Sequence, residues 1–234
     1  MIRLRPAAER GYADHGWLEA RHSFSFADYN DPAHMGWGAL RVINEDRIAP
    51  GMGFGMHGHR DMEIITWILS GELAHRDSLG NGDTIRRGEA QRMSAGRGVR
   101  HSEVNPSPDQ AVHLLQIWLL PAAPGGEASW EQKSFPVDKH PGELLLLASP
   151  DGRDGSLRIG QDARVSVAVL PAGQILTSQL ASGRLGWVQL VSGDLLLNDT
   201  RLRAGDGAAI ADLGALTFSA LATAEFLLFD LPPV

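Results

Sequence analysis

The sequence predicts an all-β protein built from two related β units. Short apolar runs, such as LRVI, EIITWIL and VHLLQIWLL, recur about every ten residues and are bounded by Gly, Asn, Asp and Pro. That spacing is typical of a β-sandwich or barrel and not of alternating strands and helices. The best helical candidate, PGGEASWEQ, is weak, whereas SLGNGD, from Ser78 to Asp83, predicts a tight turn.

An internal repeat supports the division into two units. ILSGEL, around Gly71, recurs as LVSGDL around Gly193, 122 residues later. RRGEA, around Gly88, recurs as RAGDG around Gly205, 117 residues later. Two turns in the same order and at similar spacing indicate a duplicated β structure, although turns of this kind also recur by chance.

Composition excludes several classes of function. The 234 residues carry a net charge of −7 and include no cysteine, which removes disulfides, thiolate metal sites and thiol nucleophiles. Binding to nucleic acid or to a membrane surface is disfavoured because such proteins present a basic face. The start, MIRLRPAAERG, lacks the apolar core of a signal peptide, and no run reaches about 18 apolar residues. We therefore expect a soluble, cytoplasmic protein.

Two histidine motifs are the strongest candidates for a site. Residues i and i+2 of a strand point to the same face, so His57 and His59 can direct two imidazoles to one point. His101 and Glu103 repeat this spacing in a second strand-like segment. Together they offer three nitrogens and a carboxylate, a set that suits Fe(II), Mn(II), Ni(II), Cu(II) or Zn(II). The alternative is that the HxH motif lies at an exposed turn by chance.

The repeat tests this hypothesis. At an offset of 122 residues, the first pair maps to Gln179 and Ala181; at 117 residues, the second pair maps to Phe218 and Ala220. All four candidate ligands are thus absent from the second copy, while its turns remain. We expect one unit to bind metal and the other to be a structural partner.

The chain also resembles a known family. FSFADYNDPAHMGWGALRVINEDRIAPGMGFGMHGHRDMEIITWILSGELAHRDSLGNGDTIRRGEAQRMSAGRGVRHSE follows the pattern of the pirin family, in the cupin superfamily, and the likeness extends over residues 10–135. The second half resembles the family's degenerate C-terminal cupin only in outline. The resemblance implies two cupin barrels, of the double-stranded β-helix or jelly-roll type, packed face to face. We expect a metal-binding domain over residues 1–133 and a domain without metal over 134–234, with the linker between Pro121 and Pro141.

The resemblance also implies the metal and its ligands. It implies one divalent metal, usually iron, with Ni, Cu, Mn, Co or Zn as alternatives, held by residues matching His57, His59, His101 and Glu103. Glu63 is a rival fourth ligand, because the general cupin pattern places a Glu at this spacing after HxH. We prefer Glu103, which shares a strand face with His101, and assign Glu63 a supporting position. The sequence departs from the family at Gly58, where proline is common; glycine loosens this backbone but removes no ligand.

The resemblance to bacterial pirins also implies a function. They are known for quercetin 2,3-dioxygenase activity, which opens the heterocycle of a flavonol and releases carbon monoxide. The predicted partners are therefore dioxygen and a small planar phenolic substrate, with Glu103 as the catalytic proton acceptor. The rival hypothesis is a non-enzymatic, iron-dependent redox sensor that binds a transcription factor or a metabolic enzyme. A channel to the metal that is wide enough for a flat bicyclic ligand would favour the enzyme.

Other residues receive weaker interpretations. His75 and His113 each stand alone, which is typical of surface or satisfied core residues. Gln116 and Trp118 share a strand face and line either a cavity or the core. No serine has an evident base and orienting partner, so nucleophilic catalysis is disfavoured. Four aromatic residues are expected to pack beneath the mouth of the barrel: Phe24, Phe26, Tyr29 and Trp37.

Overall fold

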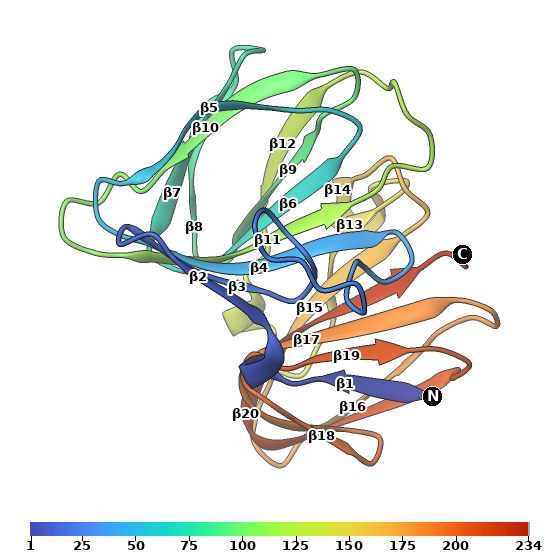
Figure 1. Cartoon of the computed structure of the whole chain (residues 1–234). Helices are drawn as coiled ribbons and strands as arrows, with labels where there is room; N and C mark the ends of the chain where they lie inside the picture. Colours follow the sequence, from blue (N-terminus) through green and yellow to red (C-terminus); the bar gives the residue numbers. More distant parts are fainter. Residues whose placement is uncertain (234) are drawn as a thin grey trace.

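The computed structural model describes residues 1–233 and consists almost entirely of β-strands. Figure 1 shows two β units, one formed mainly by the first half of the chain and the other mainly by the second half. The all-β prediction is confirmed. The helical candidate PGGEASWEQ is wrong, because its last residues belong to strand β12. Within residues 1–233 the helical segments are three short 3-10 turns: η1 (Ala7–Glu9), η2 (Val137–Lys139) and η3 (Arg153–Gly155).

The N-terminal unit contains two sheets. A seven-stranded sheet has the order β12-β9-β6-β11-β4-β3-β2, and a four-stranded sheet has the order β5-β10-β7-β8. The predicted SLGNGD turn joins β7 to β8. The strands are β2 (Gly11–Asp14), β3 (Leu18–His22), β4 (Leu40–Ile48), β5 (Gly53–His59), β6 (Glu63–Ser70), β7 (Glu72–Asp77), β8 (Gly82–Arg86), β9 (Glu89–Ser94), β10 (Val99–Val104), β11 (Val112–Leu119) and β12 (Ser129–Ser134).

The C-terminal unit is one nine-stranded sheet that curls on itself. Its main order is β1-β19-β17-β20-β15-β13-β14, with β16 paired to β20 and β18 paired to β17. The two long strands change partners along their length: β20 pairs first with β16 and then with β15, and β17 pairs first with β19 and then with β18. The strands are β1 (Ile2–Arg5), β13 (Leu145–Ser149), β14 (Leu157–Arg158), β15 (Arg164–Leu170), β16 (Ile175–Gln179), β17 (Leu185–Leu197), β18 (Thr200–Arg203), β19 (Gly207–Ile210) and β20 (Ala215–Leu231).

Strand alternation gives the large N-terminal sheet two different faces. On β4, Ile43 belongs to a core shared with the second unit, whereas Asn44 and Asp46 line a cavity inside the N-terminal barrel. On β11, Ile117 faces the shared core and Gln116 faces the cavity. Because successive residues point to opposite faces, one strand packs the domain interface and builds the site at once.

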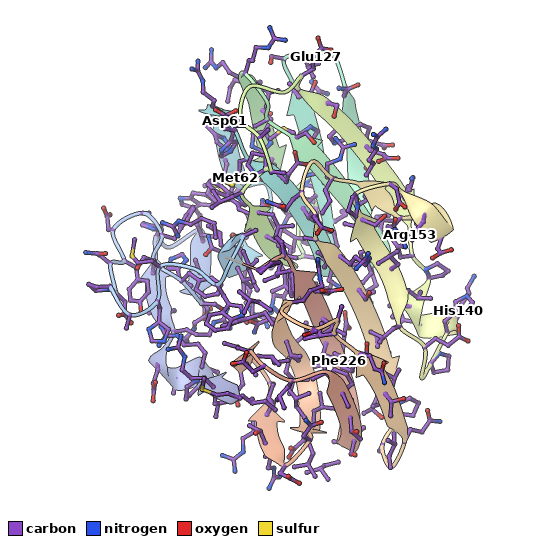
Figure 2. The ribbon with its side chains drawn as sticks, turned by 90° about the vertical axis from the view of Figure 1, so that its right-hand side faces the viewer. Asp61, Met62, Glu127, His140, Arg153 and Phe226 are labelled. Carbon is purple, nitrogen blue, oxygen red and sulfur yellow. The ribbon has the colours of Figure 1, made fainter. Side chains whose placement is uncertain are left out.

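The shared core joins the two units. It contains Ile65 and Trp67 from the first unit, and Val165, Trp187 and Phe229 from the second, all buried. The Trp67 indole also donates a hydrogen bond to Glu225 across the interface, at 3.0 Å. Figure 2 shows the side chains between the two stacked units, with Phe226 in the lower one. The two units thus pack through apolar sheet faces.

The first strand crosses between the units. Residues 2–5 form β1, which pairs antiparallel with β19 and lies in the C-terminal sheet, as Figure 1 shows. The predicted domain boundary between residues 133 and 134 falls at the end of β12, which pairs with β9 of the N-terminal unit. That boundary stays a prediction. Within residues 1–233, no helix has the length and apolar character that crossing a bilayer requires.

Candidate metal centre

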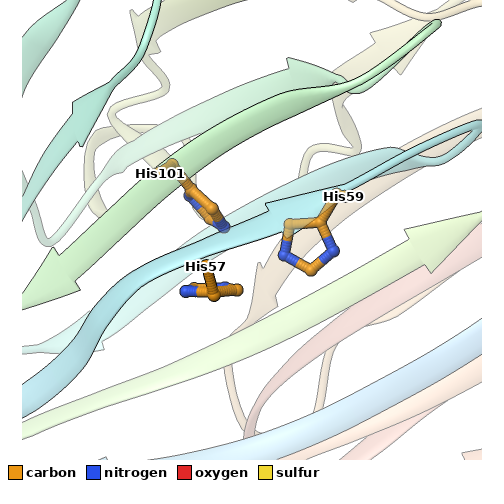
Figure 3. Close-up of side chains that lie close together, drawn as sticks. All are labelled: His57, His59 and His101. Carbon is orange, nitrogen blue, oxygen red and sulfur yellow. The ribbon is translucent and has the colours of Figure 1, made fainter.

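Three of the predicted ligands lie together. Strand β5 carries His57 and His59, and its antiparallel neighbour β10 places His101 directly opposite His57. The ring centroids of His57 and His101 are 4.4 Å apart, and those of His59 and His101 are 4.9 Å apart. One ligand nitrogen from each ring lies within 4.8 Å of the others. Figure 3 shows the three imidazoles converging from the two strands.

Glu103 lies deeper in the same barrel. Its carboxylate accepts hydrogen bonds from Gln91 Nε2 at 2.8 Å, Gln116 Nε2 at 2.9 Å and Thr66 Oγ1 at 3.4 Å. Glu103 groups with His101 and His75, again with ligand atoms within 4.8 Å of one another. The four predicted ligands therefore fall into two overlapping groups that share His101, with Glu103 in the buried one.

Glu63 lies elsewhere. Its carboxylate accepts a hydrogen bond from Ser94 Oγ at 2.7 Å, and it lines a cleft with Arg92, Arg158 and Gly160. Among the residues that the structure describes, neither group of candidate ligands includes Glu63. This placement supports the preference for Glu103 as the fourth ligand.

His75 is a residue that the sequence interpretation missed. It is buried on β7, and its Nδ1 lies 3.4 Å from Nδ1 of His101. Its ring stacks on Trp130, with centroids 5.6 Å apart, and its Nε2 lies 3.7 Å from a carboxylate oxygen of Asp77. The available signal was the HRD motif, which puts His75 and Asp77 at i and i+2 of one strand. His113 does match its interpretation, because its Nε2 meets the Glu45 carboxylate at 2.9 Å.

A cavity of about 490 Å³ opens onto the histidines and Glu103. Its size lies in the range of small-molecule sites. Aromatic rings form a continuous wall: the Trp118 ring lies 4.9 Å from His59 and 5.3 Å from Phe26, which in turn lies 5.5 Å from His22. Tyr29 also lines the cavity. The four N-terminal aromatic residues were expected to pack beneath the mouth of the barrel. Phe26 and Tyr29 meet this expectation only in part, because they line the cavity itself.

Phe24 and Trp37 take a different position. The Phe24 ring packs against Trp187 of the second unit at 4.8 Å, and Trp37 packs against the shared core. The sequence could not separate these roles, because Phe24 to Trp37 lie between β3 and β4, outside the strands, where strand alternation does not set the direction of a side chain.

Comparison with known proteins gives the family. The model of the Pirin family matches residues 3–119, and that of the quercetinase C-terminal cupin domain matches residues 146–231. The chain belongs to the pirin family. The predicted fold, with two cupin-type domains, is confirmed. This pirin is 48% identical to the quercetin 2,3-dioxygenase of Escherichia coli K12 over 234 residues, which is all of both chains.

Further relatives agree with this assignment. A pirin-like protein of Caulobacter vibrioides is 46% identical over 231 residues, covering 98% of this chain and 99% of the relative. The crystal structure of the bacterial pirin YhhW from Escherichia coli in complex with nickel(II) is 47% identical and covers 100% of both chains, with a TM-score of 0.96.

The electrostatics of the site keep the imidazoles of His59 and His101 neutral. Burial, together with the neighbouring His57, lowers the pKa of His59 to about 4. Burial and the three nearby histidines lower the pKa of His101 to about 2. Metals bind the neutral imidazole, so these rings need not lose a proton at neutral pH. Burial raises the pKa of Glu103 to about 7, although the hydrogen bonds from Thr66, Gln116 and Gln91 act in the opposite direction.

Hydrogen bonds also fix which ring nitrogens are free. Nδ1 of His57 lies 2.8 Å from the carbonyl oxygen of Gly55, so it carries the proton and leaves the lone pair on Nε2. Nε2 of His101 is buried and has no hydrogen-bond partner among residues 1–233. A buried acceptor without a partner is costly unless a ligand satisfies it. The residues present therefore fit a divalent transition metal.

Proposed function

We propose that this pirin is a metal-dependent dioxygenase that cleaves flavonols of the quercetin type. The observation that carries the proposal is the position of the histidine group and Glu103 on a cavity of about 490 Å³ with an aromatic wall. Relatives named quercetin 2,3-dioxygenase support the substrate class. A cavity of this size is typical of a small-molecule site, so it favours the enzyme hypothesis over the hypothesis of a sensor that binds a protein partner.

We propose that His57, His59, His101 and Glu103 hold one divalent transition metal, with iron(II) as the native ion. The nickel complex of the relative YhhW supports metal binding in this family and leaves the native metal open. When bound, such a metal supplies a Lewis acid and a redox centre that couple an electron-rich phenolate to dioxygen.

The chain's own residues supply positioning and proton transfer. Glu103 is the proposed acceptor for the proton of the substrate's 3-hydroxyl group. Gln91 and Gln116 donate to its carboxylate and hold it in one orientation. Trp118 and Phe26 offer flat apolar surfaces on which the rings of the substrate can stack. The apolar wall also excludes water from the reacting atoms.

The test is oxygen uptake by metal-loaded protein with quercetin. Glu103→Gln keeps the shape and an oxygen ligand but removes the base. We expect it to retain metal and quercetin binding while consuming oxygen at least tenfold more slowly, since general bases contribute about 10²–10⁴-fold. Glu63→Gln is the matched control, a buried glutamate outside the site, and should keep the parent rate.

The outcomes separate the competing hypotheses. Equal rates for the Glu103→Gln variant and the parent would remove Glu103 from the mechanism. A slow Glu63→Gln variant with normal stability would favour Glu63 as the fourth ligand. If the metal-loaded parent consumes no oxygen with any flavonol or catechol, the enzyme proposal fails and the metal-dependent sensor becomes the better hypothesis.

A further inference from the structure

A second buried carboxyl lines the same cavity, and neither the metal site nor the fold uses it. Asp46 lies on β4 with 4% of its surface exposed, and its side chain faces the interior of the N-terminal barrel. Its strand neighbours are Ala20 on β3 and Leu114 on β11, which offer no polar side-chain atom. Oδ1 of Asp46 is buried and has no hydrogen-bond partner within the described residues.

Buried Glu103 and half-buried Glu45, the two acids whose charges act on Asp46, both have hydrogen-bond partners. Glu103 receives three hydrogen bonds from side chains, and Glu45, the residue before Asp46, meets Arg10 at 2.7 Å and His113 at 2.9 Å. Asn44, two residues before Asp46 on the same face, meets His22 Nδ1 at 2.8 Å. Burying an unpartnered carboxyl costs several kcal/mol in general, so a chain retains one where a ligand completes it.

The surroundings define the ligand group that would complete Asp46. A hydroxyl group can complete Asp46 in either protonation state, because a carboxyl oxygen accepts hydrogen bonds whether or not the group is protonated. Burial and the charge of Glu103 raise the pKa of Asp46 to about 7. A neutral hydroxyl group therefore suits this carboxyl better than a cationic ligand group does. The aromatic wall of Trp118 and Phe26 requires the rest of the ligand to be flat and apolar.

We propose that Asp46 is a specificity-determining residue that accepts a hydrogen bond from a phenolic hydroxyl group other than the one directed to the metal. The site then selects planar polyphenols over phenols whose only hydroxyl is the one at the metal. This inference rests on the proposed function, because it assumes that the cavity binds flavonols. Sites built to satisfy a ligand hydroxyl discriminate strongly against analogues that lack it.

The experiment compares two flavonols that differ in their additional hydroxyls. Quercetin carries several hydroxyls, whereas 3-hydroxyflavone carries only the 3-hydroxyl beside the 4-carbonyl. Binding of each to the nickel-loaded protein is titrated without oxygen by the change in flavonol absorbance. Asp46→Leu should weaken quercetin binding at least tenfold, because leucine accepts no hydrogen bond and leaves the buried ligand hydroxyl without a partner, and it should change 3-hydroxyflavone binding by less than about threefold.

A second variant and a stability measurement guard against a purely structural effect. Asp46→Asn keeps an oxygen acceptor and should bind quercetin within about threefold of the parent. Asp46→Leu should be at least as stable to urea as the parent, because it removes an unsatisfied buried group. A marked loss of stability in both variants would show a structural role and overturn the proposal.

The remaining outcomes distinguish this inference from the function on which it rests. If the parent binds both flavonols and Asp46→Leu weakens neither, or weakens both equally, the role of Asp46 is refuted while the proposed function stands. If the metal-loaded parent binds neither flavonol, the proposed function fails and the inference falls with it.

Discussion

The two barrels of this pirin have similar strand orders but different side chains in their interiors. In the large sheets, the order β12-β9-β6-β11-β4-β3 corresponds position by position to β1-β19-β17-β20-β15-β13. The last strands differ, because β2 pairs antiparallel with β3 whereas β14 pairs parallel with β13. The pairing of β5 with β10 corresponds to that of β16 with β20. The repeat offsets of 122 and 117 residues place β5 on β16 and β10 on the start of β20. The predicted duplication is therefore a duplication of strand order.

The interiors differ in polarity. The N-terminal barrel encloses imidazoles, carboxyls and amides around a cavity. The C-terminal barrel is filled by aliphatic and aromatic side chains, including Leu195, Leu197 and Leu216. The position that corresponds to His101 is Phe218, which is fully buried and stacks on Phe226 at 4.6 Å. One copy thus contains buried polar atoms without hydrogen-bond partners within residues 1–233, whereas the interior of the other is packed with apolar side chains.

Removing one imidazole should have the largest effect on this contrast. His59→Ala should reduce metal content from about one ion per chain to none, because it takes away a ligand that shares one face of β5 with His57. Elemental analysis of the purified, folded variant measures this. His140→Ala, which removes a histidine outside both candidate groups, is the control. Full metal occupancy in the His59 variant would rule out the proposed ligand set.

Removing one buried ring from the second barrel should lower the free energy of unfolding and leave metal binding intact. Phe218→Ala deletes a fully buried ring, and such deletions typically cost about 3–5 kcal/mol of unfolding free energy. Urea denaturation measures the loss, and nickel titration of the folded variant should still give about one ion per chain. Leu221→Ala, at an exposed position of the same strand, should change stability by less than about 0.5 kcal/mol. Loss of nickel binding in the Phe218 variant would show that the second barrel contributes to the site.

The contact between His75 and His101 offers a finer test of the polar barrel. If His101 binds metal through Nε2, its Nδ1–H donates to Nδ1 of His75, 3.4 Å away. His75→Leu removes this acceptor and should weaken nickel binding about 10–100-fold, as losses of hydrogen bonds to metal ligands do. His75→Asn keeps an oxygen near the position of Nδ1 and should restore most of the affinity.

Cobalt spectra distinguish support from direct ligation. If His75 orients His101, the visible spectrum of the cobalt-saturated His75→Leu variant should match that of the parent. A changed coordination spectrum at saturation would instead make His75 a ligand, consistent with its grouping with His101 and Glu103.

The smallest expected effect concerns the interface between the barrels. Arg10 donates to Glu45 of the first unit and to the Gly205 carbonyl of the second. Burial alone would raise the pKa of Glu45, but the hydrogen bonds from His113 and Arg10 and the Arg10 charge lower it to about 2. Because the folded-state pKa lies below the unfolded value of 4.5, this stabilisation is present above about pH 5 and is lost as the pH falls towards 2.

Urea unfolding as a function of pH tests this contribution. The parent should lose about 1–2 kcal/mol through this group between pH 5 and 2, and Glu45→Gln should lack that part of the dependence. Glu127→Gln, at an exposed carboxylate, should keep the parent profile. Identical profiles for the Glu45 variant and the parent would contradict the prediction.

The sequence by itself determined the class of the fold and the histidines of the site. The period-two pattern and the regular turns require strands, and the two-residue spacing puts His57 and His59 on one strand face whatever the rest of the fold does. The absence of the candidate ligands from the second repeat also distinguished the polar N-terminal barrel from the apolar C-terminal barrel. These features are local, so the order of residues specifies them directly.

The tertiary structure alone decided which distant residues meet. The pairing of β1 with β19, far apart in the chain, could not be read from the apolar pattern of residues 2–5. His75 looked solitary because its partner His101 comes from another strand, and no sequence motif distinguishes Asp46 from its neighbour Glu45. Whether a buried polar atom finds a partner depends on strands brought together by register and packing, and only the folded chain fixes those.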